Sequence, residues 1–157
     1  MSEVATPTAL SVVYNIDLQI KTGDDTWATI DQGFNNLAEA LNENVLQYFF
    51  LGDKGYARNY VSAMAPAFTL SGVRVFGDPA QDYIFDPARK FGLMQERQTA
   101  IKLVETLADG STDTIECEAT LCNITSIGGA STDGSAVSVE IRCDGKPKAT
   151  HAAKPTG

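Results

Sequence analysis

Few residues in this 157-residue chain have the chemistry of a catalytic or metal-binding group. The only histidine, His151, lies in the terminal run 145–157, which is rich in Lys, Ala, Pro and Gly. Such a composition buries little apolar surface, so we expect residues 145–157 to form a flexible basic tail. A rigid site built on histidine is therefore not expected.

The acidic residues do not form a recognisable metal site either. Asp78, Asp82 and Asp86 recur every four residues and would share one face of a helix. No His or Cys accompanies them, and Arg89 and Lys90 follow directly. A solvated helix face with local ion pairs is favoured over a metal site.

The cysteines and the glycine-rich loop offer no further site. Cys117, Cys122 and Cys143 are odd in number and contain no CxxC pair, so we expect reduced thiols. The glycine-rich segment 128–134 precedes a Val-rich strand pattern, whereas a phosphate cradle needs a helix at that point. The sequence therefore predicts no enzyme activity, no cofactor and no bound metal.

Charge and composition limit the class of protein. Hydrophobic residues make up 43% of the chain and mean hydropathy is −0.11, which excludes membrane-spanning, collagen-like and wholly disordered chains. Twelve basic and twenty acidic residues give a net charge of −8. The tail holds three lysines and no acid, so residues 1–144, the expected single domain, carry a net charge of −11. Tight binding of nucleic acid is not expected from such a domain.

Three segments alternate between apolar and polar residues, the pattern of half-buried strands. They span residues 15–21, 114–121 and 135–143. Turn-forming residues at 108–111 and 128–134 precede the second and third of these segments, which predicts an antiparallel meander. The alternation places Cys117 and Cys143 among the core side chains.

Two further elements are predicted from local signals. Asp78 as N-cap with Pro79 at the first helical position predicts a short helix over about 78–86, ending before Pro87. Residues 34–50 are ambiguous. Their apolar spacing is close to helical, but residues 45–51 (VLQYFFL) are also typical of a strand covered on both faces.

Two blocks carry a resemblance to a known family. They are residues 42–59, which contain NENVLQYFFLGD, and residues 65–85, which contain the phrase SGVRVFGDPAQD. These blocks resemble the major tail tube proteins of long-tailed (siphovirus-type) bacteriophages, which are related in fold to the inner-tube proteins of type VI secretion systems. The match contains no catalytic motif.

The resemblance implies a mainly β fold, a tail-tube-type β-sandwich or barrel with one flanking helix. It also implies that stacked hexameric rings form a conduit for the genome. Residues 42–53 would then be strand, with a turn near 42–44, and residues 52–65 would be a long loop between subunits. The implied partners are other copies of the chain, the tape-measure, tail-tip and tail-terminator proteins, and double-stranded DNA in passage. The implied location is the virion tail, assembled in the host cytoplasm without membrane insertion.

Assembly residues follow from this family and from residue type. Aromatic and Arg side chains are common interface anchors, and they gather between residues 48 and 64. The candidate contacts are Tyr48, Phe50, Tyr56, Arg58, Asn59, Tyr60 and Met64. The competing interpretation is a loop folded over its own core.

A conduit for DNA should not hold its cargo, so an acidic wall is expected. From strand parity, the candidate lumen-lining residues are Asp17, Glu116, Glu118 and Glu140. The alternative is that these carboxylates lie on an exterior solvated face.

Two other functions stay open at this stage. A β-sandwich ligand-binding or adhesion module would need a cluster of exposed aromatic residues, for which Tyr14, Trp27 and Tyr56 are candidates. The inner tube of a contractile tailocin or secretion system would differ only in whether a sheath surrounds it.

Overall fold

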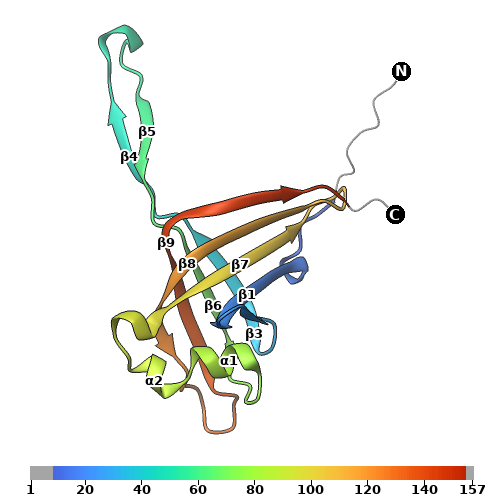
Figure 1. Cartoon of the computed structure of the whole chain (residues 1–157). Helices are drawn as coiled ribbons and strands as arrows, with labels where there is room; N and C mark the ends of the chain where they lie inside the picture. The colour runs from blue at the N-terminus through green and yellow to red at the C-terminus, as the bar shows by residue number, and fades with distance from the viewer. Residues whose placement is uncertain (1–8, 155–157) are drawn as a thin grey trace.

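The computed structural model describes residues 9–154, and its main element is one curved antiparallel sheet (Figure 1). The sheet has seven strands in the order β2-β1-β7-β8-β9-β6-β3. Their bounds are β1 Ile16–Gly23, β2 Thr26–Thr29, β3 Phe34–Ala40, β6 Ala67–Val73, β7 Gln98–Thr106, β8 Thr112–Thr125 and β9 Ala136–Ala152. Strands β2 and β3 are the two edges, so the sheet curves around its core without closing.

The predicted strands and meander are confirmed. β1, β8 and β9 contain the three alternating segments, and β7, β8 and β9 pair consecutively in antiparallel order. One face of these strands forms the core, where Ile20, Ile101, Leu121 and Ile141 are almost completely buried. Cys117 is buried among them, and Cys143 packs against the cluster, as the alternation predicts.

The expectation of a flexible tail is wrong for residues 145–152. Strand β9 continues through them and pairs with β8, with Lys148 opposite Glu116 and Ala152 opposite Thr112. The backbone ladder orders this segment although its side chains are largely exposed, and composition alone does not report such pairing. Pro147 falls where the register shifts, a position at which a missing N–H costs no ladder bond. Residues 155–157 lie outside the described part.

The helix at 78–86 is confirmed as α1, Pro79–Ile84, but it is not alone. Asp78 caps it, because its Oδ2 accepts a hydrogen bond from the Gln81 N–H at 3.0 Å. Pro87 begins a second short helix, α2 (Pro87–Lys90), which Asp86 caps. Pro is favoured at the first helical position, so the residue expected only to stop one helix also starts the next.

The ambiguous region 34–50 is strand, so the helical interpretation is wrong. β3 and β4 (Asn44–Tyr48) are separated by a break at residues 41–43, as the family resemblance implies. Two details differ from expectation. Residues 51–53 form a 3-10 turn, and the expected long loop contains a further strand, β5 (Arg58–Ala63), which pairs with β4.

Candidate assembly surfaces

Strands β4 and β5 form a hairpin, here called the arm (residues 44–63), that projects away from the sheet (Figure 1). Its base is fixed by two hydrogen bonds: Ala65 N–H donates to the Leu41 carbonyl at 2.9 Å, and Asn42 Nδ2 donates to the Ala65 carbonyl at 3.0 Å. Every residue of β4 and β5 is exposed in the single chain. In a single copy, therefore, the predicted strand at residues 45–51 is not covered on both faces.

The arm has a defined internal structure. The Tyr48 ring stacks on Phe50 with centroids 5.7 Å apart and also meets Tyr60 at 6.3 Å. Near the tip, Arg58 holds Asp53 with two hydrogen bonds, Nε to Oδ2 at 2.7 Å and Nη2 to Oδ1 at 3.1 Å. This contact with Asp53 raises the pKa of Arg58. These contacts link the 3-10 turn at residues 51–53 to the start of β5.

All seven candidate contact residues are exposed. Six of them lie in the arm or at the end of β4, and Met64 lies at its base with 52% of its surface exposed. The competing interpretation, a loop folded over its own core, is therefore wrong. Their role as contacts between copies stays a prediction. Further exposed apolar residues that the sequence analysis did not select are Val45, Leu46, Phe49, Leu51 and Val61.

An apolar groove opens between the two ends of the curved sheet. This edge groove has a volume of about 520 Å³ and lies between β1, the segment before it, and β3. Buried Leu18, Ile30 and Leu70 line it, together with half-buried Phe34 and Leu37. The sequence analysis missed it, because a groove between sheet edges depends on a strand order that local patterns do not fix.

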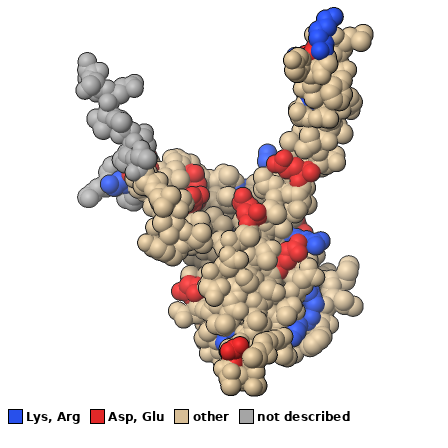
Figure 2. All heavy atoms as spheres, turned by 180° about the vertical axis from the view of Figure 1, so that it is seen from behind, with Lys and Arg blue, Asp and Glu red and all other residues tan. Residues whose placement is uncertain are grey.

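The charges of the edge groove and of the arm are opposite. Asp17 and Asp31 are the charged residues that line the groove, and among the described residues no Lys or Arg lines it. The arm contains Lys54, Arg58 and Asp53, a net charge of +1. Figure 2 shows basic atoms at the end of the arm and mostly uncharged atoms along it.

The four candidate lumen residues share the sheet face opposite the core. Lys102 of β7 pairs with Glu116 of β8 on one side and with Gln19 of β1 on the other, so these three side chains lie on the same face. Asp17 is two residues from Gln19 along β1 and therefore shares that face with Glu116. Glu118 follows by alternation, and Glu140 precedes Arg142, which pairs with Thr120 on that face. Arg142 Nε donates to Glu140 Oε1 at 2.7 Å, and this contact lowers the pKa of Glu140.

Basic residues also occupy this face. Lys102 and Lys148 lie in register on either side of Glu116, and Lys102 lies over the Trp27 ring at 4.5 Å. Glu118 lies opposite Ala100 and Asp144, without a cation as direct partner. Whether the face lines a bore stays a prediction.

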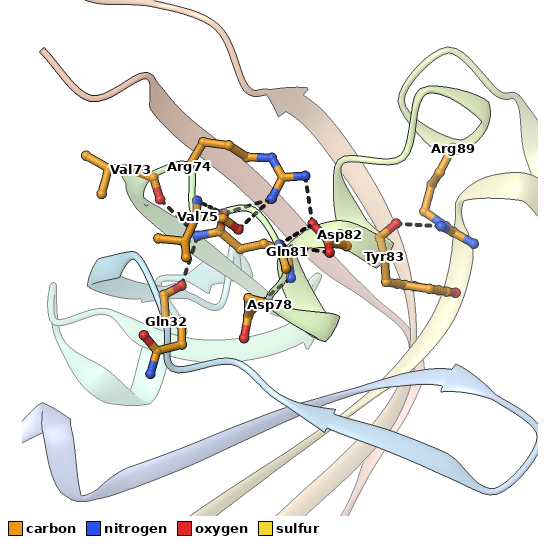
Figure 3. Close-up of polar contacts among 10 residues, drawn as sticks. Gln32, Val73, Arg74, Val75, Asp78, Gln81, Asp82, Tyr83 and Arg89 are labelled. Carbon is orange, nitrogen blue, oxygen red and sulfur yellow. Dashed lines mark hydrogen bonds and ion pairs between the residues drawn. The ribbon is translucent and has the colours of Figure 1, made fainter. Parts of the chain in front are cut away.

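The phrase at 71–82 that carries the resemblance builds the junction between β6 and α1 (Figure 3). Gln81 is fully buried, and its Nε2 donates to the Gln32 and Val73 carbonyls, each at 2.9 Å. Its Oε1 accepts from Val75 N–H at 2.7 Å. Arg74 Nη2 meets Asp82 Oδ1 at 3.0 Å. Asp82 therefore forms a local ion pair, as expected of a solvated face, whereas Asp78 caps the helix and is buried.

Glycine is required where β6 meets the start of β3. A Cβ on Gly72 would lie 2.0 Å from the Gly33 carbonyl oxygen, closer than any real contact. That same oxygen accepts a hydrogen bond from Val73 N–H at 2.8 Å. The two glycines thus let β3 and β6 approach closely beside Gln81.

A second exposed apolar surface lies at the helical end, opposite the arm in Figure 1. This helical-end patch consists of Phe76, Phe91, Leu93 and Met94, each at least 78% exposed. Its turn is held by Glu96 Oε2, which accepts from Leu93 N–H at 3.1 Å. The sequence analysis missed it because the run at 91–94 has no strand or helix period.

The described residues form no cluster of three or more His, Cys, Asp or Glu side chains suited to a metal ion. His151 contacts Asp113, with Nδ1 and Oδ1 2.6 Å apart. The three cysteines are free thiols, and the Sγ atoms of Cys117 and Cys143 are 2.9 Å apart. Contact with Cys143 raises the pKa of Cys117. Within residues 9–154 no helix is long and apolar enough to cross a membrane.

The aromatic cluster needed by an adhesion module does not form among its three candidates. Tyr14 lies before β1, Trp27 lies in β2 beside Lys102, and Tyr56 lies at the tip of the arm. These three residues therefore do not supply the exposed aromatic cluster that an adhesion module needs.

Comparison with known proteins gives matches at the level of structure. No family model matches the sequence, and no curated protein matches it. A chain from the tail of an empty gene transfer agent particle matches with a TM-score of 0.65 over 90% of this chain and 99% of that one, at 14% identity. The SPP1 tail tube matches with a TM-score of 0.64 over 94% of this chain and 81% of that one, at 12% identity.

The fold is that of the tail tube proteins. A chain of the anti-feeding prophage baseplate also matches, with a TM-score of 0.57 over 98% of this chain and 100% of that one, at 12% identity. The tail-tube fold is thus present here at sequence identities of 12–14%. At this distance the likeness concerns fold alone, so the argument for function returns to the surfaces of this chain.

Proposed function

We propose that this protein is the structural subunit of a phage tail tube, which polymerises as stacked hexameric rings into a conduit for the genome. The observation that carries the proposal is the arm, an ordered apolar hairpin that one copy leaves entirely exposed on a tail-tube fold. A monomeric protein rarely exposes a contiguous apolar surface of this kind, which marks an interaction site.

The arm has the composition of an interface core. Tyr48, Phe50, Tyr56, Tyr60 and Arg58 supply the residue types that dominate binding energy at protein interfaces. Asn59 and Met64 complete the contact set. Because the arm is ordered before it binds, little of the interaction energy is spent on arranging it.

The outward sheet face, with its four candidate carboxylates, is proposed to line the bore. Fixed carboxylates repel DNA phosphates over a Debye length of about 8–10 Å at moderate salt. Glu116 and Glu118 at the centre of the face, with Glu140 and Asp17 beside them, would keep the duplex hydrated. Lys102 and Lys148, beside Glu116, reduce this repulsion. The total repulsion therefore depends on how many copies of the face surround the DNA in each ring.

The partners follow from this role. The chain associates with itself, and the tape-measure, tail-tip and tail-terminator proteins would define the length and ends of the tube. Double-stranded DNA passes without adhering. The location is the virion tail, after assembly in the host bacterial cytoplasm, and the role is structural and not enzymatic.

A second candidate is the inner tube of a contractile tailocin or secretion system. The likeness to the anti-feeding prophage baseplate chain favours it, because that match spans 98% of this chain. The two roles share the polymer and differ in the exterior. Binding of a sheath protein to preformed tubes would separate them.

Sedimentation of the wild-type chain and of one variant tests the proposal. The wild-type chain should convert from monomer to large polymer as concentration rises. A variant in which residues 44–63 are replaced by a short Gly-Ser linker should stay monomeric and folded, because the bond between Leu41 and Ala65 remains at the base. If the chain without the arm polymerises as the wild-type chain does, the proposed role of the arm is contradicted. A wild-type chain that stays monomeric at all concentrations would contradict the function itself.

A further inference from the structure

The arm and the edge groove are complementary surfaces that a single chain cannot bring together. The arm projects from the sheet with its apolar side chains exposed, away from β1 (Figure 1). The edge groove opens between β1 and β3 and exposes part of the core. Its volume of about 520 Å³ falls in the range of sites that enclose a small organic molecule, which is enough for the aromatic side chains of a hairpin tip.

We infer that the edge groove of one copy receives the arm tip of a second copy. This inference rests on the proposed function and names the surface that the arm binds. Phe49, Phe50 and Leu51 form an exposed apolar run next to the ordered turn of the tip. Their counterparts in the groove are Leu18, Phe34 and Leu37, which lie along its length.

Charge favours this occupant over other apolar segments. Asp17 and Asp31 line the groove, and no Lys or Arg among residues 9–154 does; Asp17 also belongs to the outward face of the sheet, so Asp31 is the carboxylate assigned to the groove alone. The tip brings Lys54, and Arg58 beside Asp53, with a net charge of +1. Leu93 and Met94 of the helical-end patch line a second pocket of about 350 Å³, but the charged residue in its lining is Arg97, which does not complement a basic tip. Complementary charges of this kind fix which surfaces meet and in which register.

The geometry of such a contact determines the kind of assembly. The arm and the groove are different surfaces, so the contact is heterologous, and a pair of copies joined by it keeps one free groove on the first copy and one free arm on the second. Repetition of a heterologous contact closes a ring or continues as a filament. The same contact covers the part of the core that is exposed in the edge groove. Burial of this apolar surface adds to the free energy of association.

Photo-crosslinking tests this placement. p-Benzoylphenylalanine in place of Phe50 should crosslink to residues 12–18 or 34–37 of another copy in assembled polymer, with isotope-labelled copies mixed in to show that the link joins two chains. The same probe in place of Phe91, in the helical-end patch, is the matched control and should not link to the groove. Polymer whose Phe50 crosslinks fall only elsewhere would overturn the groove assignment and leave the proposed function standing. A chain that forms no polymer would overturn both.

Charge reversal gives an independent measurement. Asp31→Lys should raise the concentration needed for assembly about tenfold, equivalent to about 1.4 kcal/mol, whereas Asp24→Lys in the β1–β2 turn should leave it unchanged. Adding Lys54→Asp to the Asp31→Lys chain should restore assembly. A double variant that assembles no better than Asp31→Lys alone would overturn the charge pairing, provided that both remain folded by circular dichroism.

Discussion

Gln81 joins three parts of the chain through one side chain. It accepts from Val75 N–H and donates to the Gln32 and Val73 carbonyls, so α1, the end of β6 and the segment before β3 are fixed together. The sequence predicts the cap at Asp78 from residue type and position. It does not predict the role of Gln81, because the carbonyl of Gln32 lies 49 residues away along the chain.

Gln81→Ala should lower the free energy of unfolding by about 3 kcal/mol, because a buried polar group left without a partner costs about 1–3 kcal/mol. Three backbone groups lose their partner in this variant. Urea denaturation measures the change. The matched control is Gln95→Ala, an exposed glutamine in the turn Met94–Arg97, which should change stability by less than about 0.5 kcal/mol. Equal effects of the two variants would contradict the structural role of Gln81.

At the scale of elements, strand parity was the reliable guide. The alternating segments at 15–21, 114–121 and 135–143 are strands because one face of each packs into the core. Apolar periodicity gave the wrong prediction at 34–50, where residues with helical spacing form strands. β3 pairs at the edge of the sheet, and β4 belongs to the arm. The prediction was also wrong at 145–152, because backbone pairing with β8 orders residues whose side chains bury little surface.

The proposed assembly assigns contacts between copies to the arm. We expect Tyr56→Ala and Arg58→Ala each to weaken assembly while the monomer remains folded. Tyr56 is 78% exposed and Arg58 holds the tip only through Asp53, so neither contributes to the core. Light scattering across a concentration series measures assembly, and thermal unfolding of the monomer measures folding.

The control for these variants is Asp133→Ala, an exposed residue in the loop between β8 and β9. It should assemble as the wild type does. If Tyr56→Ala and Arg58→Ala also assemble at the wild-type concentration, the tip of the arm is not a contact between copies.

At the scale of the whole molecule, the sheet presents one face to the core and one outward face that carries both acidic and basic side chains. The sequence predicts that Asp17, Glu116, Glu118 and Glu140 share a face, because their parity follows from the strands that carry them. It cannot predict the edge groove, which arises because β2 and β3 are the two edges of the seven-stranded sheet and do not pair with each other. That feature depends on strand order, which comes from contacts between distant segments.

Reversing charge on the outward face tests the proposed bore. Glu116→Lys combined with Glu118→Lys should leave assembly intact but make the tubes retain short duplex DNA, because added lysines bind phosphates and release counterions. Cosedimentation of DNA with tubes measures this at low and moderate salt. The control, Asp24→Lys combined with Asp133→Lys, adds the same charge in loops. Retention by neither variant would remove Glu116 and Glu118 from the lining.

Electron microscopy of the purified wild-type chain at high concentration tests the central claim, that copies of this protein associate into a tube, most directly. We expect hollow tubes with a regular axial repeat and six subunits in each ring, in which the arm of each copy contacts another copy. Particles that remain single 16.8 kDa chains at every concentration, also in the presence of a tail-tip complex, would contradict it.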